Sequence, residues 1–382
     1  MSDHGSMSVL GVLLASGVAG AQPCSQWTPK DAIPGPRYEH AAAYDSARGR
    51  LVVFGGYNGQ NYYGDTWEWD GSAWMPRFGA PAPTYRVFAT MAYDSVRRRV
   101  VLFGGLYATG PLSDTWEWDG QTWTPRETAV RPSARFAHAA AYDSARARMV
   151  VFGGFTGSNL DDTWAWDGTT WTLLDEGGGP EARQQHRMVY DASRDRLVMF
   201  GGQGVTGILA DTWEYDGVAW AMRSPLTPPG ARAAHAMVYD ERRSRVVMFG
   251  GVGESYLLDT WEYIPALGPQ GAWAWNSITG PTSRAGQAMA YDAARSSVVM
   301  VGGWNGTEAL AETWALACEP ACPANCDAST TTPVLNVADF VCFLNRFAAG
   351  DPWANCDGST ALPVLNVNDF VCFLNKFVAG CT

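Results

Sequence analysis

A Phe-Gly-Gly motif recurs along this chain at nearly constant spacing, and it constrains the fold more than any other feature. The copies begin at Phe54, Phe103, Phe152, Phe200, Phe249 and, with Val in place of Phe, Val301. Successive copies lie 49, 49, 48, 49 and 52 residues apart. Downstream of each copy comes Asp-Thr-Trp, or Glu-Thr-Trp in the sixth, beginning at Asp65, Asp114, Asp162, Asp211, Asp259 and Glu312. A period near 50 predicts six copies of one supersecondary unit.

Each unit has the pattern of four short strands. The first ends in Tyr-Asp, and the second is apolar throughout, as in 51–54, which is typical of a strand covered on both faces. The third carries Trp67 and Trp69 in the first unit, and Asp70-Gly71 is a strong hairpin signal before a fourth strand near Trp74. Four strands per unit predict the blades of an all-β propeller.

The Gly-Gly, the preceding Tyr-Asp and the spaced tryptophans together resemble the kelch repeat, over roughly residues 25–317. The resemblance implies a six-bladed kelch propeller around a central channel. The sixth unit ends at Leu316 without a fourth-strand tryptophan, whereas Trp27 precedes the first unit. We therefore expect the amino-terminal strand to complete the sixth blade. Cys24 and Cys318 would then replace the missing hairpin as a disulfide, unless Cys24 pairs with a cysteine of the tail.

Composition and the two ends of the chain indicate an exported protein. Val9–Val18 is apolar and Ala19-Gly20-Ala21 resembles a cleavage site, so we predict a signal peptide at 1–21, although its start lacks Lys or Arg. The propeller would span 22–318, a linker 319–324 and a second domain 325–382.

Eight cysteines in an exported chain predict disulfides. No later segment is long enough to span a membrane, and a net charge of -11 argues against nucleic acid. We expect a secreted, extracellular or cell-surface anchored protein.

Two repeated positions are candidate ligand-binding residues. An arginine lies 17 residues before each Phe or Val of the motif: Arg37, Arg86, Arg135, Arg183, Arg232 and Arg284. Three residues later come His40, His138, His186 and His235, with Ala89 and Gln287 in the second and sixth units. We expect these side chains to ring the channel mouth, where guanidiniums could bind carboxylates or an acidic glycan. The alternative, which strict repetition favours, is that they hydrogen-bond neighbouring loops within each blade.

The loops that join the strands differ in how much their sequences vary among the six units. Loops between strands one and two, and three and four, are nearly identical among units, whereas those between strands two and three and between blades vary. The variable loops emerge on one face and contribute Tyr57, Tyr62, Tyr63, Tyr107, Phe155, Tyr256 and Trp304. A variable, aromatic-rich face on a regular scaffold is where we expect a glycan or protein ligand.

The carboxy-terminal tail contains a duplication, in which the segment from Asn325 matches the segment from Asn355. Each copy has apolar residues at helical spacing and ends in glycine, which predicts a loop followed by a helix. The pair resembles a dockerin, and most closely the variant that ends in Gly-Cys, here Gly380-Cys381. The resemblance implies a cohesin-like or other surface receptor as the partner of the tail.

The dockerin resemblance implies calcium in the tail, and we expect no cofactor in the propeller, which has no metal-ligand motif and no phosphate loop. The implied ligands are Asn325, Asp327, Ser329, Asn336 and Asp339, then Asn355, Asp357, Ser359, Asn366 and Asp369. However, the loops are three residues longer than twelve and poor in carboxylates. In the alternative, Asn336 caps the helix, and the disulfides Cys326–Cys342 and Cys356–Cys372 brace each loop, with Cys322–Cys381 as a terminal clasp. Both alternatives stay open.

The favoured function is a non-catalytic kelch binding module anchored or docked through its tail. The rival is an extracellular carbohydrate-active enzyme, such as an epimerase or mutarotase, tethered in the same way. An oxidase is disfavoured because the blades lack cysteine, and the repeated Glu68, Glu117, Glu214 and Glu262 are expected to be solvated. Polar side chains unique to one or two blades that converge at the channel would favour the enzyme. A propeller that is a spacer without a ligand is the third alternative.

Overall fold

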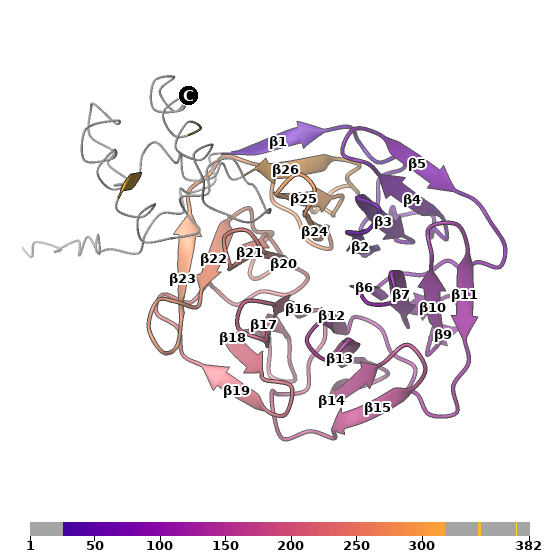
Figure 1. Ribbon diagram of the computed structural model, residues 1–382, viewed down its shortest axis with the longest axis horizontal. Coiled ribbons are helices and arrows are strands. Elements are labelled where there is room, and N and C mark those ends of the chain that lie inside the picture. The colour runs from indigo at the N-terminus through magenta and orange to yellow at the C-terminus, as the bar shows by residue number, and fades with distance from the viewer. Residues whose placement is uncertain (1–25, 318–342, 345–371, 373–382) are drawn as a thin grey trace, which may run out of the picture. The chain divides into compact units, whose positions relative to one another are not determined.

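The computed structural model describes residues 26–317, Phe343, Leu344 and Cys372. Residues 26–317 form six four-stranded antiparallel sheets arranged as blades around a central opening (Figure 1). The first strand of each blade lies innermost and the fourth lies at the rim. The predicted all-β, six-bladed propeller is confirmed.

The first three blades follow the repeat in chain order. Blade one contains β2 (Ala41–Asp45), β3 (Arg50–Phe54), β4 (Thr66–Trp69) and β5 (Trp74–Arg77). Blade two contains β6 (Thr90–Asp94), β7 (Arg99–Phe103), β10 (Thr115–Trp118) and β11 (Trp123–Arg126), with a two-stranded ribbon of β8 (Leu106–Tyr107) and β9 (Gly110–Pro111). Blade three contains β12 (Ala139–Asp143), β13 (Arg148–Phe155), β14 (Asn159–Trp166) and β15 (Trp171–Asp175).

The last three blades repeat this order until the ring closes. Blade four contains β16 (Arg187–Asp191), β17 (Arg196–Gln203), β18 (Ile208–Tyr215) and β19 (Trp220–Arg223). Blade five contains β20 (Ala236–Asp240), β21 (Arg245–Phe249), β22 (Thr260–Ile264) and β23 (Ala272–Asn276). Blade six contains β24 (Ala288–Asp292), β25 (Ser297–Val301), β26 (Thr313–Ala317) and, from the amino-terminal end, β1 (Trp27–Lys30).

Closure by the amino-terminal strand is confirmed by its pairing. β1 is antiparallel to β26, with Trp27 opposite Leu316 and Lys30 opposite Thr313. Trp27 also takes the place of a fourth-strand tryptophan, because its indole N–H donates to Thr260 Oγ1 of the preceding blade at 3.4 Å. The corresponding indole-to-threonine bonds in the other blades are 2.9–3.1 Å long and join Trp74–Thr313, Trp123–Thr66, Trp171–Thr115, Trp220–Thr163 and Trp273–Thr212.

The hydrophobic core lies between neighbouring blades. Val52 and Phe54 of β3, for example, pack with Met91, Leu102 and Trp123 of the next blade. Val52 is 0% exposed and Phe54 1%, as expected for a second strand covered on both faces. Large apolar side chains in tight contact across every blade boundary make the ring one continuous packed unit.

The face that carries the hairpins between strands one and two is held by repeated ion pairs, and we call it the hairpin face. Arg48 donates to Asp45 at 2.6 Å and to Glu68 at 2.7 Å. Glu68 also accepts from the indole of Trp118 in the next blade at 2.9 Å. The expectation that Glu68, Glu117, Glu214 and Glu262 are solvated is wrong, because they are 0–4% exposed. Glu68, Glu117 and Glu214 accept from arginine and from an aromatic donor of the next blade, and Glu262 accepts from Arg243, Arg245 and Asn276, so each has hydrogen bonds where it is buried.

Several predictions from the sequence fall outside the described residues: the signal peptide, the Cys24–Cys318 disulfide, the calcium ligands and the linker. Cys372 is described, and it is disulfide-bonded. Phe343, Leu344 and Cys372 are helical, at positions where the duplication predicts helices. Among the described residues, no helix has the length and hydropathy needed to cross a bilayer.

Candidate functional site: the loop face and the central channel

The six repeated arginines are buried within their blades. Arg135 is 0% exposed and donates to both carboxylate oxygens of Asp162, at 2.6 and 2.8 Å, and to the carbonyl oxygen of Gly153 at 3.1 Å. The indole of Trp164 donates to the same carboxylate at 2.7 Å. Burial raises the pKa of Asp162, but the Arg135 guanidinium outweighs it and holds the pKa below its usual range.

The other blades repeat this unit of arginine, carboxylate and indole. The pairs are Arg37–Asp65, Arg86–Asp114, Arg183–Asp211, Arg232–Asp259 and Arg284–Glu312. The expected position of these arginines at the channel mouth is therefore wrong, and they make hydrogen bonds within each blade, which is the alternative that strict repetition favoured. Bidentate pairing fixes the loop between strands two and three to the loop that enters the blade.

The repeated histidines are buried and neutral. His40 is 7% exposed, and His138, His186 and His235 are 0–1% exposed. Burial first, and then the nearby Arg37 and Arg187, lower the pKa of His40 to about 3. His40, His138 and Gln287 line the channel, where His138 Nε2 lies 2.7 Å from Thr90 Oγ1.

On the other face, which we call the loop face, each blade presents one pair of variable residues. The residue after the arginine forms an antiparallel bridge with the residue after Gly-Gly. In blade one the backbone bonds are mutual, Tyr38 N–H to Tyr57 O at 2.9 Å and the reverse at 3.0 Å. We call these the cross-loop pairs: Tyr38–Tyr57, Val87–Leu106, Phe136–Phe155, Gln184–Gln203, Ala233–Val252 and Ala285–Trp304. The backbone is the same in every blade, whereas the side chains differ.

Six rings of the loop face lie in a continuous series, which we call the aromatic row: Trp304, Tyr38, Tyr57, Tyr62, Tyr85 and Tyr107. Successive centroids are 5.2, 5.7, 4.5, 6.1 and 4.6 Å apart. These distances are within the range of interacting aromatic pairs. Tyr62 is 47% exposed and Tyr85 38%. The row therefore crosses blades six, one and two and leaves aromatic surface open to a partner.

The structure gathers some of the predicted aromatics and separates others. Tyr57, Tyr62, Tyr107 and Trp304 lie in the row. Tyr63 faces the scaffold, because the guanidinium carbon of Arg37 lies 4.4 Å from its ring centroid. Phe155 packs on Phe136, whose ring also neighbours Phe88. Tyr256 lies against Gly306, where an added Cβ would be 3.1 Å from its ring.

Sequence reasoning did not single out Tyr38, Tyr85, Phe88 and Phe136. All four lie in the loops between blades, one or two residues from a repeated arginine. The signal that could have found Tyr38 and Phe136 is the change of residue directly after the arginine, from Tyr38 to Val87, Phe136, Gln184, Ala233 and Ala285.

A closed ring of backbone hydrogen bonds surrounds the channel on the loop face. It joins six residues that we call the collar: Glu39, Phe88, Ala137, Gln185, Ala234 and Gly286. The N–H of each donates to the carbonyl of the collar residue in the preceding blade, and Glu39 donates to Gly286, at 2.7–2.9 Å throughout. All six have φ between 51° and 68°. The left-handed backbone turns each N–H and C=O along the ring, so the collar joins all six blades.

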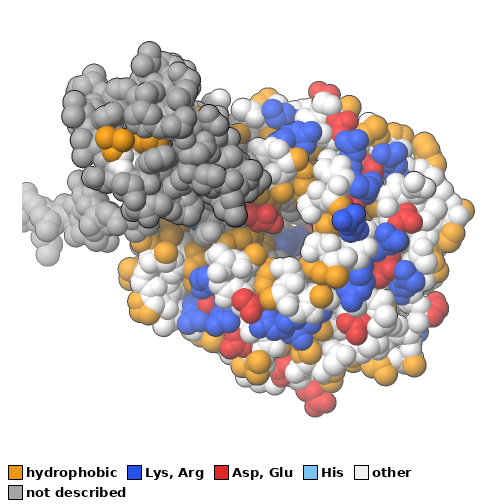
Figure 2. All heavy atoms as spheres, in the orientation of Figure 1, with side chains coloured by type: hydrophobic (Ala, Val, Ile, Leu, Met, Phe, Trp, Pro, Cys, Tyr) orange, Lys and Arg blue, Asp and Glu red, His pale blue; other side chains and the backbone are white. Residues whose placement is uncertain are grey.

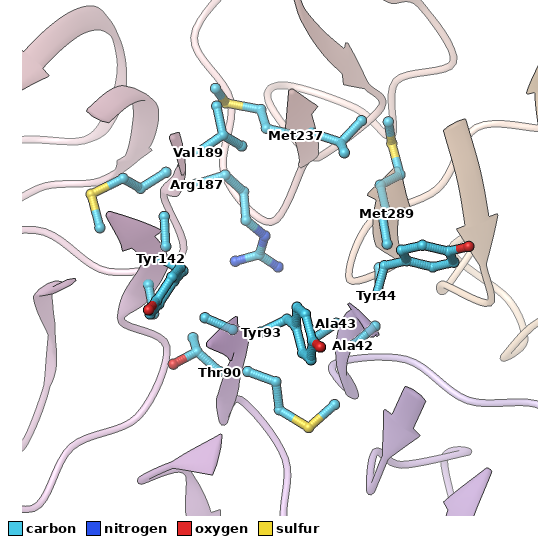
Figure 3. Close-up of a pocket in the computed structure, with 18 of the residues that line it drawn as sticks. Ala42, Ala43, Tyr44, Thr90, Tyr93, Tyr142, Arg187, Val189, Met237 and Met289 are labelled. Carbon is cyan, nitrogen blue, oxygen red and sulfur yellow. The ribbon is translucent and has the colours of Figure 1, made fainter. Parts of the chain in front are cut away.

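The channel inside the collar contains a cavity of about 360 Å³ lined by the six innermost strands. Its wall is mostly Ala, Met and Val, with tyrosines toward the hairpin face. Figure 3 shows the Arg187 guanidinium projecting into the middle of this space. Arg187 Nη2 lies 3.9 Å from Glu39 Oε2. Glu39 and Arg187 are charged side chains that only one blade each contributes at their repeat positions, and sequence reasoning missed their convergence.

Charge also separates the two faces. The loops between strands two and three contain carboxylates and no Lys or Arg. In the view of Figure 2, Lys and Arg side chains gather around the central hollow of the face turned to the reader. The loop-face arginines of the carboxylate pairs are at most 2% exposed, so they contribute almost no positive surface. Among the described residues, no group of three or more His, Cys, Asp and Glu side chains is arranged to hold a metal ion.

Comparison with known proteins identifies the repeat. The family model described as the KLHDC2/KLHL20/DRC7 Kelch-repeats domain matches residues 21–131 and 121–263, well over half of the chain. A comparison with curated proteins finds no match.

Proposed function

This chain belongs to the kelch-repeat family, and we propose that it is a non-catalytic interaction module whose aromatic row binds a protein segment with apolar and basic side chains. The observation that carries the proposal is the row of six rings across three blades. Tyr and Trp are enriched at protein interfaces because they offer a large apolar area, a polar atom and few rotatable bonds.

The scaffold beneath the row supports binding without rearrangement. Tyr38 and Tyr57 are fixed by mutual backbone hydrogen bonds, and Trp304 is fixed in the same way to Ala285. A side chain that is ordered before binding loses little conformational entropy when a partner covers it.

The charge of the loop face favours a basic partner. Arg131 is paired with Glu127 at 3.7 Å, whereas carboxylates such as Glu254 and Glu308 lie in loops without any Lys or Arg. A Lys or Arg of the partner could therefore gain from nearby carboxylates and from the faces of the tyrosine rings. Binding should weaken as salt is raised, because exposed charges are screened.

We further propose that the propeller is exported and anchored or docked through its duplicated tail. The apolar segment before Ala21 and the disulfide at Cys372 both support an oxidising, extracellular location. Amino-terminal sequencing of the secreted protein would test export. A calorimetric titration of the full chain with calcium would distinguish calcium loops from loops braced by disulfides alone.

The aromatic row can be tested by peptide display. The full chain is used to select peptides, and bound sequences are compared between wild type and the double variant Tyr62→Ala with Tyr85→Ala. Phe78→Ala is the matched control, because Phe78 is 87% exposed but lies outside the row. We expect the double variant to bind selected peptides about tenfold or more weakly, and the control to bind as wild type does. Equal binding by all three, or selection of acidic peptides, would contradict the proposal.

A carbohydrate-active enzyme is the second candidate, and the meeting of Glu39 with Arg187 in the channel is the observation in its favour. Incubation with a broad glycan set, followed by analysis of mass and anomeric state, tests it. Altered sugar that is lost in Glu39→Gln would favour the enzyme. If a glycan instead binds unaltered through the aromatic row, the ligand of the row is a sugar rather than a protein.

A further inference from the structure

Arg187 is unlike any other residue at its repeat position. The first residue of the innermost strand is Ala41, Thr90, Ala139, Ala236 or Ala288 in the other blades, and none of these side chains carries a charge. Arg187 extends from this position into the cavity (Figure 3). Its side chain is 25% exposed, although channel walls surround it on all sides.

The Arg187 guanidinium has fewer acceptors than the arginines inside the blades. Arg187 Nη1 donates to the carbonyl oxygen of His186 at 3.2 Å, and the nearest carboxylate oxygen, on Glu39, is 3.9 Å away. Arg135, by comparison, has three acceptors on Asp162 and Gly153 and two more on Ser133. A guanidinium has five N–H donors, so most of those on Arg187 remain open to a ligand in the cavity.

Glu39 is placed beside Arg187 by the collar and by a glycine. At Gly286 an added Cβ would lie 2.8 Å from Glu39 Oε1, so the carboxyl occupies the space that a side chain there would take. Burial raises the pKa of Glu39 to about 7, and Arg187 opposes this only in part. Glu39 is therefore largely protonated in slightly acidic solution and charged in alkaline solution.

We propose that the central channel binds a small molecule with one carboxylate and an apolar body, with the carboxylate on Arg187. A carboxylate matches the planar fork of a guanidinium, and such charge-assisted pairs are strong away from bulk water. The apolar body would contact Ala43, Met91, Ala141, Val189 and Met237, which line the same cavity. A space of about 360 Å³ suits a small organic acid.

The protonation of Glu39 couples this binding to pH. Neutral Glu39 can donate to the ligand carboxylate, whereas charged Glu39 repels it and competes for Arg187. The histidines and tyrosines around the site do not change charge between pH 6 and 9. The histidines His40, His138, His186 and His235 have pKa values lowered by burial and the arginines. The channel tyrosines have pKa values raised by burial, Tyr93 to about 12. Glu241 lines the hairpin end of the same cavity, next to Asp240 of β20, and burial raises its pKa as well.

The test is a calorimetric titration of the full chain with benzoate and with its neutral isostere benzamide at pH 6 and pH 8. We expect saturable benzoate binding at pH 6, about tenfold weaker binding at pH 8, and little binding of benzamide at either pH. Arg187→Ala should abolish the preference for benzoate over benzamide. This variant should fold, because alanine occupies the same position in four blades. Glu39→Gln should bind benzoate with an affinity that no longer depends on pH.

Arg131→Ala is the matched control, since it removes an arginine of the loop face that lies outside the channel. Unchanged benzoate binding in Arg187→Ala, equal binding of benzoate and benzamide, or the absence of benzoate binding at pH 6 would each overturn the proposal. The aromatic row is separate from this site, so Tyr62→Ala with Tyr85→Ala should leave benzoate binding intact even where it abolishes peptide binding.

Discussion

The hairpin face and the loop face are built from the same six repeats, yet they use repetition in different ways. On the hairpin face both backbone and side chains recur, and blades are joined by contacts such as Tyr44 to Asp292 at 2.5 Å and Tyr142 to Asp94 at 2.6 Å. On the loop face the backbone recurs in the collar and the cross-loop pairs, but the side chains change. Repeated side chains therefore belong to the scaffold, and varied side chains on a repeated backbone form the candidate sites.

The largest expected loss of stability comes from removing a buried carboxylate of the hairpin face. Glu68→Ala removes a carboxylate that accepts from Arg48, Arg77 and Trp118, and it leaves Arg77 and Trp118 without this acceptor and Arg48 with Asp45 alone. We expect a loss of about 3–5 kcal/mol in the free energy of unfolding. Urea denaturation measures it, with Phe78→Ala as an exposed control that should change stability by less than about 0.5 kcal/mol. A loss below about 1 kcal/mol would mean that the hairpin face is not the stabilising one.

A smaller effect on the free energy of unfolding is expected from the repeated histidines, because burial keeps them neutral. The pKa of His40 is lowered to about 3, so the folded state binds fewer protons than the unfolded state, whose histidine titrates near 6.5. Stability contributed by the neutral ring is therefore present above pH 6.5 and lost as the pH falls toward 3. His40→Gln, which copies Gln287 of blade six, should regain on the order of 1–2 kcal/mol at pH 5 and nothing at pH 8. Denaturation at both pH values measures this, and equal effects at the two would contradict it.

The smallest effect on stability is expected from the aromatic row. Tyr62→Ala with Tyr85→Ala should change the free energy of unfolding by less than about 1 kcal/mol, because both rings are partly open to solvent. Thermal melts of the double variant against wild type give the value. A loss comparable to that of Glu68→Ala would show that the row belongs to the scaffold, and the contrast between the two faces would then fail.

The sequence predicts the scaffold well because each of its signals is local or periodic. The Phe-Gly-Gly spacing gave the number of blades, and the unmatched Trp27 gave the closure, which the pairing of Trp27 with Leu316 confirms. Arg37 and Asp65 were both visible as repeats, but 28 residues separate them. Only the folded blade brings them together, so the sequence favoured hydrogen bonds within each blade but did not identify Asp65 as the acceptor.

The candidate sites were harder to predict, because they depend on contacts between blades. Glu39 and Arg187 lie 148 residues apart in the chain, and the ring alone brings them within 3.9 Å. Tyr38 and Tyr85 extend the aromatic row, but neither stands out in its own loop. A site that combines single side chains from different repeats leaves no periodic signal in the sequence.

The collar sets the bore of the channel without the help of any side chain. Six residues with one backbone conformation and six hydrogen bonds of nearly equal length close on themselves, so the circumference follows from the number of blades. A substitution at a collar position can change the charge or shape presented to the channel, as Glu39, Phe88 and Gly286 illustrate, while the bore stays constant. In this molecule the number of blades thus sets the width of the channel available to a ligand. Single substitutions at the collar change which ligand chemistry the channel can bind.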